Sequence, residues 1–183
     1  MPLLISRLFI YMSLSIGRTV IHPHHGPVTV TEHMTRQLRG KPVEYVELLV
    51  LSSQMTISVP LKTVEDIGLR DVACATQLDR LADVLCAPTT EFEKSWARRM
   101  KAYSSKIITG EPLQIAQVVR DLMRRREEKG ISMAEREMLR DGLAPLVAEV
   151  AIATGVTEEQ AEQVISDMIT TGERETLEQV PAA

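Results

Sequence analysis

Hydrophobic and polar residues alternate along the first third of the chain in a way that is typical of β-strands. Three stretches are rich in β-branched residues and alternate in part: VTVTEHM (28–34), VEYVELLVL (43–51) and MTISVP (55–60). The segment QLRGKP between the first two contains the Gly and Pro of a hairpin loop. We therefore expect a small antiparallel β module in this part of the chain.

From TQLDRLADVLCAP onward, the hydrophobic positions recur with the period of an α-helix. The pattern predicts helices near 77–86, 91–109, 112–129, 133–153 and 158–170. Four pairs have the spacing of a helix-capping residue and its partner: Thr76 with Asp79, Thr90 with Glu93, Ser132 with Glu135, and Thr157 with Gln160. The helix ends are marked by Pro88, Gly110, Gly130, Gly155 and Gly172. The predicted fold class is α+β, with the β module followed by an all-α domain.

The two ends of the chain are expected to lie outside the packed domains. The opening MPLLISRLFIYMSLSIG looks like a signal peptide, but Arg7 interrupts its apolar run and no small-residue cleavage pattern follows. It is also too short to span a membrane. Because Met12 directly precedes strand-like sequence, we expect residues 1–11 to be an upstream extension. Residues 171–183 are acidic and lack strong periodicity, which predicts a flexible tail.

Charge is distributed unevenly along the 183 residues, whose net charge is −4. Residues 94–140 carry 12 Lys and Arg against 6 Asp and Glu, whereas residues 141–183 carry 1 against 9. A basic block of this kind is expected of a protein that binds the phosphate backbone of a nucleic acid. It is equally compatible with a solvated helical face that the acidic C-terminal segment neutralises, and charge alone does not separate the two interpretations.

Several basic residues of this block share a helical face. Lys94, Arg98 and Lys101 are spaced by four and three, and Phe92, Trp96 and Tyr103 begin an adjoining stripe. The only tryptophan of the chain thus borders a basic face. A lone tryptophan on a helix is most often a core anchor. The functional alternative is an aromatic side chain that stacks on a base while neighbouring cations hold phosphates.

The run RRREEK (124–129) is weaker evidence for a basic binding surface than its three consecutive arginines suggest. Consecutive arginines point about 100° apart, so that only Arg120 and Arg124 clearly share a face. Cations near a helix C-terminus already complement the helix dipole. Arg136 and Arg140, four residues apart on the next predicted helix, could extend a basic patch that Glu135 and Glu137 dilute.

Cysteines and histidines are the remaining candidates for chemistry. Cys74 and Cys86 fit no close ligand spacing, so we expect buried thiols in a reducing cytosol and neither a disulfide nor a zinc pair. The stretch HPHHGP (22–27) holds three of the four histidines, but no Cys or acidic cluster supplies further ligands, which favours a turn over a metal site. No nucleophile is paired with a base and no Gly-rich phosphate loop is present. We therefore expect no enzyme and no cofactor.

Several motifs together resemble one known family. They are GRTVIHPHHGPV, VEYVELLV, MTISVPLKTVEDIGLRDV, SWARRMKAYSSKIITGE and IAQVVRDLMRRREEKGISMAEREML. In this order they closely resemble the CarD family of bacterial RNA polymerase-binding transcription regulators, over about residues 16–169. The family pattern begins close to Met12, which supports the exclusion of residues 1–11.

The resemblance implies a domain organisation and partners. Residues 12–73 would form a Tudor-like module that docks on the RNA polymerase β subunit, and residues 74–170 a helical domain that contacts promoter DNA at the upstream edge of the melted region. The sigma factor is a further candidate partner. The resemblance also implies a cytoplasmic protein, associated with the nucleoid through polymerase, that is monomeric when bound and has no contact with a membrane.

The resemblance also implies roles for individual residues. Trp96 occupies the position of the tryptophan that lies at the edge of the melted DNA and stabilises the open complex. The implied DNA contacts besides Trp96 are Arg98, Arg99, Lys101, Arg125 and Arg136. Arg36 matches a residue that contacts polymerase, whereas Ser58 replaces an arginine of related sequences, which puts the strength of docking in question. In the histidine stretch, His24 and His25 match a PHHG turn, and His22 replaces a usual tyrosine.

Two other classes of function are compatible with parts of the sequence. A helical adaptor that binds only protein would use the basic block on an acidic partner. A stand-alone DNA-binding repressor is disfavoured, because the chain offers no evident recognition helix with base-reading side chains and its net charge is negative.

Overall fold

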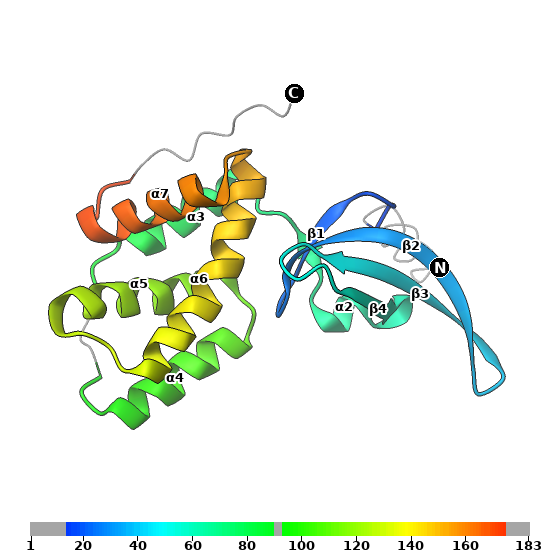
Figure 1. The fold of residues 1–183 in the computed structure, drawn as a ribbon, viewed down its shortest axis with the longest axis horizontal. Coiled ribbons are helices and arrows are strands. Elements are labelled where there is room, and N and C mark those ends of the chain that lie inside the picture. Colours follow the sequence, from blue (N-terminus) through cyan, green and yellow to red (C-terminus); the bar gives the residue numbers. More distant parts are fainter. Residues whose placement is uncertain (1–13, 90–92, 175–183) are drawn as a thin grey trace. The chain divides into compact units, whose positions relative to one another are not determined.

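The computed structural model describes residues 14–89 and 93–174, so the expected extension at 1–11 and most of the expected tail lie outside the described residues. The chain divides into two compact units, residues 1–72 and 73–183 (Figure 1). In the part of the chain that the structure describes, the first unit contains a five-stranded sheet and the second a group of five helices. The predicted α+β class is therefore confirmed.

All strands of the first unit pair antiparallel in the order β4-β3-β2-β1-β5. They are β1 (Thr19–His22), β2 (Gly26–Leu38), β3 (Lys41–Val50), β4 (Thr56–Pro60) and β5 (Arg70–Asp71). A 3-10 turn, η1 (Leu61–Thr63), and a short helix, α2 (Val64–Ile67), connect β4 to β5. The three predicted strands are present, and β5, which has only two residues, carried no pattern that would have predicted it.

The core of the β unit lies at one end of a long hairpin. Val28, Val30, Val46 and Leu48 are almost fully buried, because their alternation places them on one face of β2 and β3. Beyond the bulge that follows Val30, most residues of the hairpin are exposed or only half-buried.

The hairpin closes more tightly than the sequence suggested. Leu38 pairs directly with Lys41, and the two residues between them, Arg39 and Gly40, both have positive φ angles, 52° and 75°. Such a two-residue loop matches the twist of the flanking strands. The predicted loop QLRGKP is therefore mostly strand.

The second unit contains α3 (Ala75–Cys86), α4 (Trp96–Ile108), α5 (Pro112–Lys129), α6 (Met133–Thr154) and α7 (Glu158–Thr171). Their core is built from Leu and Val side chains with Ile165 and Met168 of α7. Helices α5 and α6 approach closely at Gly142, where an added Cβ would lie 3.2 Å from Val119 Cγ2. Among the described residues, no helix is long and apolar enough to cross a membrane.

Gly130, Gly155 and Gly172 are the C-caps of α5, α6 and α7, as predicted, whereas the predicted helix starts are confirmed only in part. Ser132 and Thr157 cap α6 and α7 with their partners Glu135 and Gln160. The start of α3 was predicted too late, because Cys74 is its N-cap and the Cys74 backbone N–H donates to Gln77 Oε1 at 2.9 Å. Thr90 lies outside the described residues, and Ser95 is the N-cap of α4.

The cysteine prediction was wrong for Cys74. Its position at a helix N-cap leaves this side chain exposed, while Cys86, the last residue of α3, is half-buried and its thiol pKa is raised by burial. Both cysteines are free thiols, as predicted.

Candidate functional site

Trp96 is the first residue of α4, and its side chain is 51% exposed. The core-anchor interpretation of this tryptophan is therefore wrong. Tyr103, two turns later on the same helical face, is buried, and burial raises its pKa to about 12. Trp96 thus lies at the end of a buried stripe, where the helix begins and its first side chain remains accessible to a partner.

The indole of Trp96 is held by the capping residue of another helix. Its Nε1 donates a hydrogen bond to the Ser132 hydroxyl at 3.2 Å. Ser132 caps α6: its hydroxyl accepts from the backbone N–H of Glu135, and its own backbone N–H donates to Glu135 Oε2 at 2.9 Å. The start of α4 is thereby attached to the start of α6 through Trp96 and Ser132.

Beneath this contact lies a buried ion pair. Arg99 and Glu135 are 3% and 2% exposed, and Arg99 Nη2 lies 2.7 Å from Glu135 Oε1. A second nitrogen of the same guanidinium, Nε, donates to that oxygen at 2.8 Å, while Nη1 donates to the Glu93 carbonyl at 2.7 Å. Burial by itself raises the pKa of Glu135, but hydrogen bonds from Ser132 and Arg99 outweigh it and hold the pKa below its usual value.

This geometry corrects the expected role of Arg99, which was a phosphate contact beside Trp96. Its guanidinium is directed into the α4–α6 interface, where Glu135 and a backbone carbonyl occupy its donors. Arg125 of α5 is also drawn inward. Its side chain is 20% exposed, and its Nε lies 3.6 Å from Glu135 Oε1. Both arginines therefore act first as partners of Glu135.

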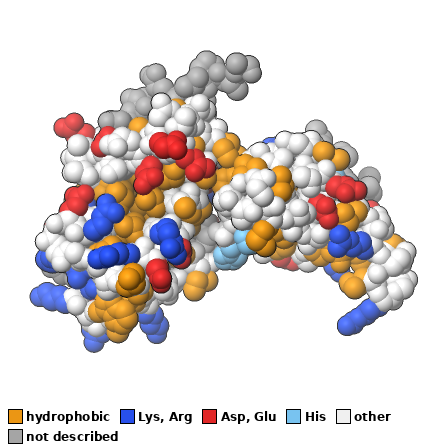
Figure 2. Space-filling model, viewed as in Figure 1, with side chains coloured by type: hydrophobic (Ala, Val, Ile, Leu, Met, Phe, Trp, Pro, Cys, Tyr) orange, Lys and Arg blue, Asp and Glu red, His pale blue; other side chains and the backbone are white. Residues whose placement is uncertain are grey.

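Other predicted cations remain on the surface. Arg98 and Lys101 of α4 and Arg136 in the first turn of α6 are exposed, as is Lys94 just before α4. Met133, which directly follows Ser132, is 71% exposed. In the helical unit, Figure 2 shows Lys and Arg side chains gathered around exposed hydrophobic side chains over α4 and α5, and acidic side chains over α7. The surface of the helical unit over α4 and α5 thus combines apolar and basic groups.

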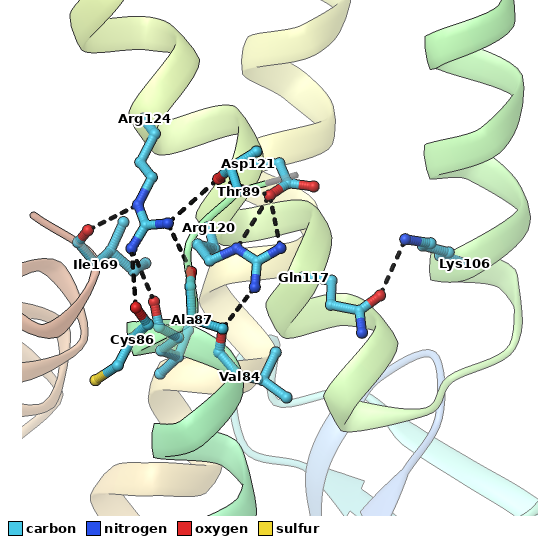
Figure 3. Close-up of polar contacts among 11 residues, drawn as sticks. Val84, Cys86, Ala87, Thr89, Lys106, Gln117, Arg120, Asp121, Arg124 and Ile169 are labelled. Carbon is cyan, nitrogen blue, oxygen red and sulfur yellow. Dashed lines mark hydrogen bonds and ion pairs between the residues drawn. The ribbon is translucent and has the colours of Figure 1, made fainter. Parts of the chain in front are cut away.

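Arg120 and Arg124 of α5 have a structural role (Figure 3). Arg120 donates to the Val84 carbonyl at 2.8 Å, and Arg124 donates to the carbonyls of Ala87 at 2.7 Å and Ile169 at 2.9 Å. The two guanidinium groups therefore satisfy carbonyls at the C-terminal ends of α3 and α7, where the last carbonyls of a helix have no partner within it. The sequence suggested that these arginines complement the dipole of their own helix. In the structure they bind carbonyls of other helices instead.

The two residues expected to bind polymerase share one partner. Arg36 on β2 donates to Glu47 Oε1 at 3.2 Å, and Ser58 on β4 donates to the same oxygen at 3.3 Å. The Arg36 guanidinium also lies over the ring of Tyr45, 5.6 Å from its centroid. Glu47 was not predicted as a site residue. It lies on β3, the strand between β2 and β4, and therefore between Arg36 and Ser58.

The histidine stretch forms the turn between β1 and β2. His22 is buried, and its Nδ1 accepts a hydrogen bond from the His24 backbone N–H at 3.1 Å. Burial and the neighbouring His25 and His24 lower the pKa of His22 to about 4. Within residues 14–89 and 93–174, no group of three or more His, Cys, Asp or Glu side chains is arranged to hold a metal ion.

Comparison with known proteins relates both units to one family. Residues 14–73 match the model of the CarD-like/TRCF RID domain, and residues 80–166 match the model of the CarD C-terminal domain. A curated relative from Bacillus subtilis (strain 168), named "Putative transcription factor YdeB", is 28% identical over 145 residues, which cover 79% of this chain and 95% of the relative.

Proposed function

Because the chain belongs to the CarD family, with a CarD-like/TRCF RID domain followed by a CarD C-terminal domain, we propose that it is a transcription regulator that stabilises the open promoter complex. The β unit docks on the β subunit of RNA polymerase, and the helical unit contacts promoter DNA at the upstream edge of the melted region. Such a regulator acts in the cytoplasm, on the nucleoid, and has no catalytic step of its own.

The observation that carries this proposal is the exposed indole of Trp96 at the start of a helix that also carries exposed cations. Arg98 and Lys101 of α4 and Arg136 of α6 are exposed and accessible to phosphates. An aromatic side chain beside cations is the arrangement that unstacked nucleic acid favours, since bases stack on the ring while phosphates pair with the cations. The half-buried Arg125 is a secondary phosphate contact, and Arg99 is excluded from this set.

Two weak interactions are sufficient for this function. Once the β unit is bound to polymerase, the contact of the helical unit with adjacent DNA becomes effectively intramolecular. A modest affinity for DNA is then enough, which is compatible with a chain of net charge −4. On the polymerase side, the surface formed by Arg36, Glu47 and Ser58 is the proposed docking face.

Stabilisation of the open complex requires a preference for melted over closed promoter DNA. A ligand with equal affinity for both states shifts neither population. Trp96 supplies the difference in affinity between the two states, because its side chain can insert at the upstream edge of the melted region only after the base pairs there unstack. A coupling free energy of about 1 to 3 kcal/mol would lengthen the open-complex lifetime about 5- to 150-fold if it acted wholly on collapse.

The lifetime of a preformed promoter complex, measured with purified cognate polymerase with and without this protein, tests the proposal. We expect the protein to lengthen the lifetime. An unchanged lifetime, with polymerase binding demonstrated separately, would contradict the proposal and favour a helical adaptor that contacts only protein.

A further inference from the structure

We propose that Ser132, with the buried Glu135–Arg99 pair behind it, is a positioning residue that fixes the Trp96 indole in the orientation in which it meets DNA. This inference rests on the proposed function, in which Trp96 stacks at the edge of the melted region. It assigns to the capping box of α6 a role beyond the start of a helix, and it restricts the kind of surface that Trp96 can recognise.

The Ser132 hydroxyl has no remaining freedom to rotate. A hydroxyl offers one donor and two acceptor lone pairs. Ser132 Oγ donates to Glu135 Oε2 at 2.9 Å, and it accepts from the Glu135 backbone N–H at 3.3 Å and from Trp96 Nε1 at 3.2 Å. With all three positions occupied, the lone pair that receives the indole N–H points in a fixed direction.

The carboxylate of Glu135 is fixed in turn by its second oxygen. Oε2 accepts from the backbone N–H and the hydroxyl of Ser132, while Oε1 accepts a hydrogen bond from Arg99 Nε and lies 2.7 Å from Arg99 Nη2. Arg99 lies three residues after Trp96 on α4, and Glu135 lies three residues after Ser132 on α6. Two contacts, Trp96–Ser132 and Arg99–Glu135, therefore join the two helices one turn apart. The indole cannot turn away from Ser132 without breaking the outer contact, and the inner contact keeps Ser132 in place.

Preorganisation of the indole gives this arrangement a functional consequence. An exposed side chain otherwise exchanges rotamers on the picosecond to nanosecond timescale, and its immobilisation on binding weakens affinity. A tryptophan that is already held loses less freedom when it meets its partner. Ser132 thus raises the effect of Trp96 on the open complex without a contact of its own with DNA.

The same contact defines what the indole can recognise. Indole has a single hydrogen-bond donor and no acceptor, and that donor is given to Ser132. The surface that Trp96 presents is therefore apolar and aromatic, and suits the face of an unstacked base. Recognition by stacking is tolerant of sequence, because every base has such a face. We infer that the Trp96 contact selects melted DNA rather than a particular base.

Ser132→Gly is the test variant, because it removes the hydroxyl while glycine is still tolerated as an N-cap. The matched control is Thr157→Gly, which makes the same kind of change in the capping box of α7. Since Trp96 is the only tryptophan, time-resolved fluorescence anisotropy of the full chain reports its local motion alone. We expect faster local depolarisation in Ser132→Gly, wild-type behaviour in Thr157→Gly, and recovery in Ser132→Thr, which retains a hydroxyl.

Open-complex lifetime provides the functional comparison. We expect Ser132→Gly to reduce the extension of the lifetime by about 2- to 10-fold, which is the effect of one newly mobile side chain. Trp96→Phe, which lacks the N–H, should show a similar loss, and adding Ser132→Gly to it should cause little further change. Additive effects of the two substitutions would overturn the inference, as would unchanged anisotropy in Ser132→Gly. A Trp96→Ala variant with the full wild-type lifetime would instead contradict the proposed function and leave the anisotropy result to decide the positioning role.

Discussion

The Arg99 guanidinium and the Glu135 carboxylate meet across the α4–α6 interface with Nη2 and Oε1 2.7 Å apart, and both side chains are almost completely buried. A buried ion pair is a weak contributor to stability when it is compared with apolar residues, but removal of one partner is costly because it leaves an uncompensated charge. The pair therefore makes the start of both helices sensitive to single substitutions.

Glu135→Gln is expected to destabilise the helical unit by about 3 kcal/mol, near the lower end of the range for breaking a buried pair. Glutamine keeps the shape of the side chain, but its NH₂ group must face either Arg99 or the Ser132 N–H, both of which are donors. Urea unfolding at neutral pH measures the change. Glu137→Gln, on an exposed side chain of the same helix, is the matched control and should stay within about 0.5 kcal/mol of wild type. Equal effects of the two substitutions would contradict this account of the pair.

The stability of the β unit should fall between pH 7 and pH 5 because of His22. The folded unit holds the pKa of His22 at about 4, below its usual value of 6.5. The unfolded chain therefore binds a proton more readily in this range, so that stability is complete above the unfolded pKa and is lost as the pH falls toward the folded one. The expected loss is about 2 kcal/mol at pH 5. Protonation would also place a donor at Nδ1 opposite the His24 N–H.

Amide hydrogen exchange in β1 and β2 measures this pH dependence in the full chain. His22→Tyr is the informative variant, because tyrosine is the residue expected at this position from the family pattern and does not titrate between pH 7 and pH 5. Its β unit should lose less stability than wild type over that range. An equal loss in both proteins would show that His22 does not titrate as the structure implies.

The DNA contact should weaken steeply as the salt concentration rises. Each phosphate that the protein neutralises on duplex DNA contributes about 0.9 to the slope of log affinity against log salt concentration. Lys101→Gln is therefore expected to lower that slope by about 1 in titrations of promoter complexes. Arg80→Gln removes an exposed charge from α3 and is the control. If the two variants had the same slope, Lys101 would not be a phosphate contact.

Ser58→Arg should strengthen the docking of the β unit on polymerase. An arginine at this position lies opposite Glu47 in the β3–β4 register and adds a cation to the face that contains Arg36. An exposed ion pair contributes up to about 1 kcal/mol, so the gain in affinity for the polymerase β subunit is expected to be at most about fivefold. Binding titrations should include Ser53→Arg, which adds the same charge in the exposed β3–β4 turn. A gain with Ser53→Arg alone would place the docking face elsewhere.

The sequence predicted local features better than contacts between helices. The pairs Ser132–Glu135 and Thr157–Gln160 were evident because capping acts over three residues. The bond from Trp96 to Ser132 spans 36 residues and depends on how α4 packs against α6, which no local pattern encodes.

A signal for the burial of Arg99 was nevertheless present. Trp96, Arg99 and Tyr103 are spaced by three and four, which places them on one face of a helix. The grouping of Arg99 with Arg98, its neighbour in sequence but about 100° away around the helix, obscured this stripe. The partner that makes burial of the charge possible, Glu135, was identified as a capping residue and as a charge that dilutes a basic patch, but not as the partner of Arg99. A helical-period analysis that includes charged residues would have separated the two arginines.

The central claim is that Trp96 stabilises the melted promoter, and the lifetime of the open complex tests it most directly. Purified cognate polymerase would be challenged with a competitor after complex formation, in the presence of wild type, Trp96→Ala or Thr157→Gly. We expect wild type and Thr157→Gly to lengthen the lifetime equally, and Trp96→Ala to lose most of that effect while it remains folded and bound to polymerase. A folded, polymerase-bound Trp96→Ala protein that lengthened the lifetime as much as wild type would contradict the claim.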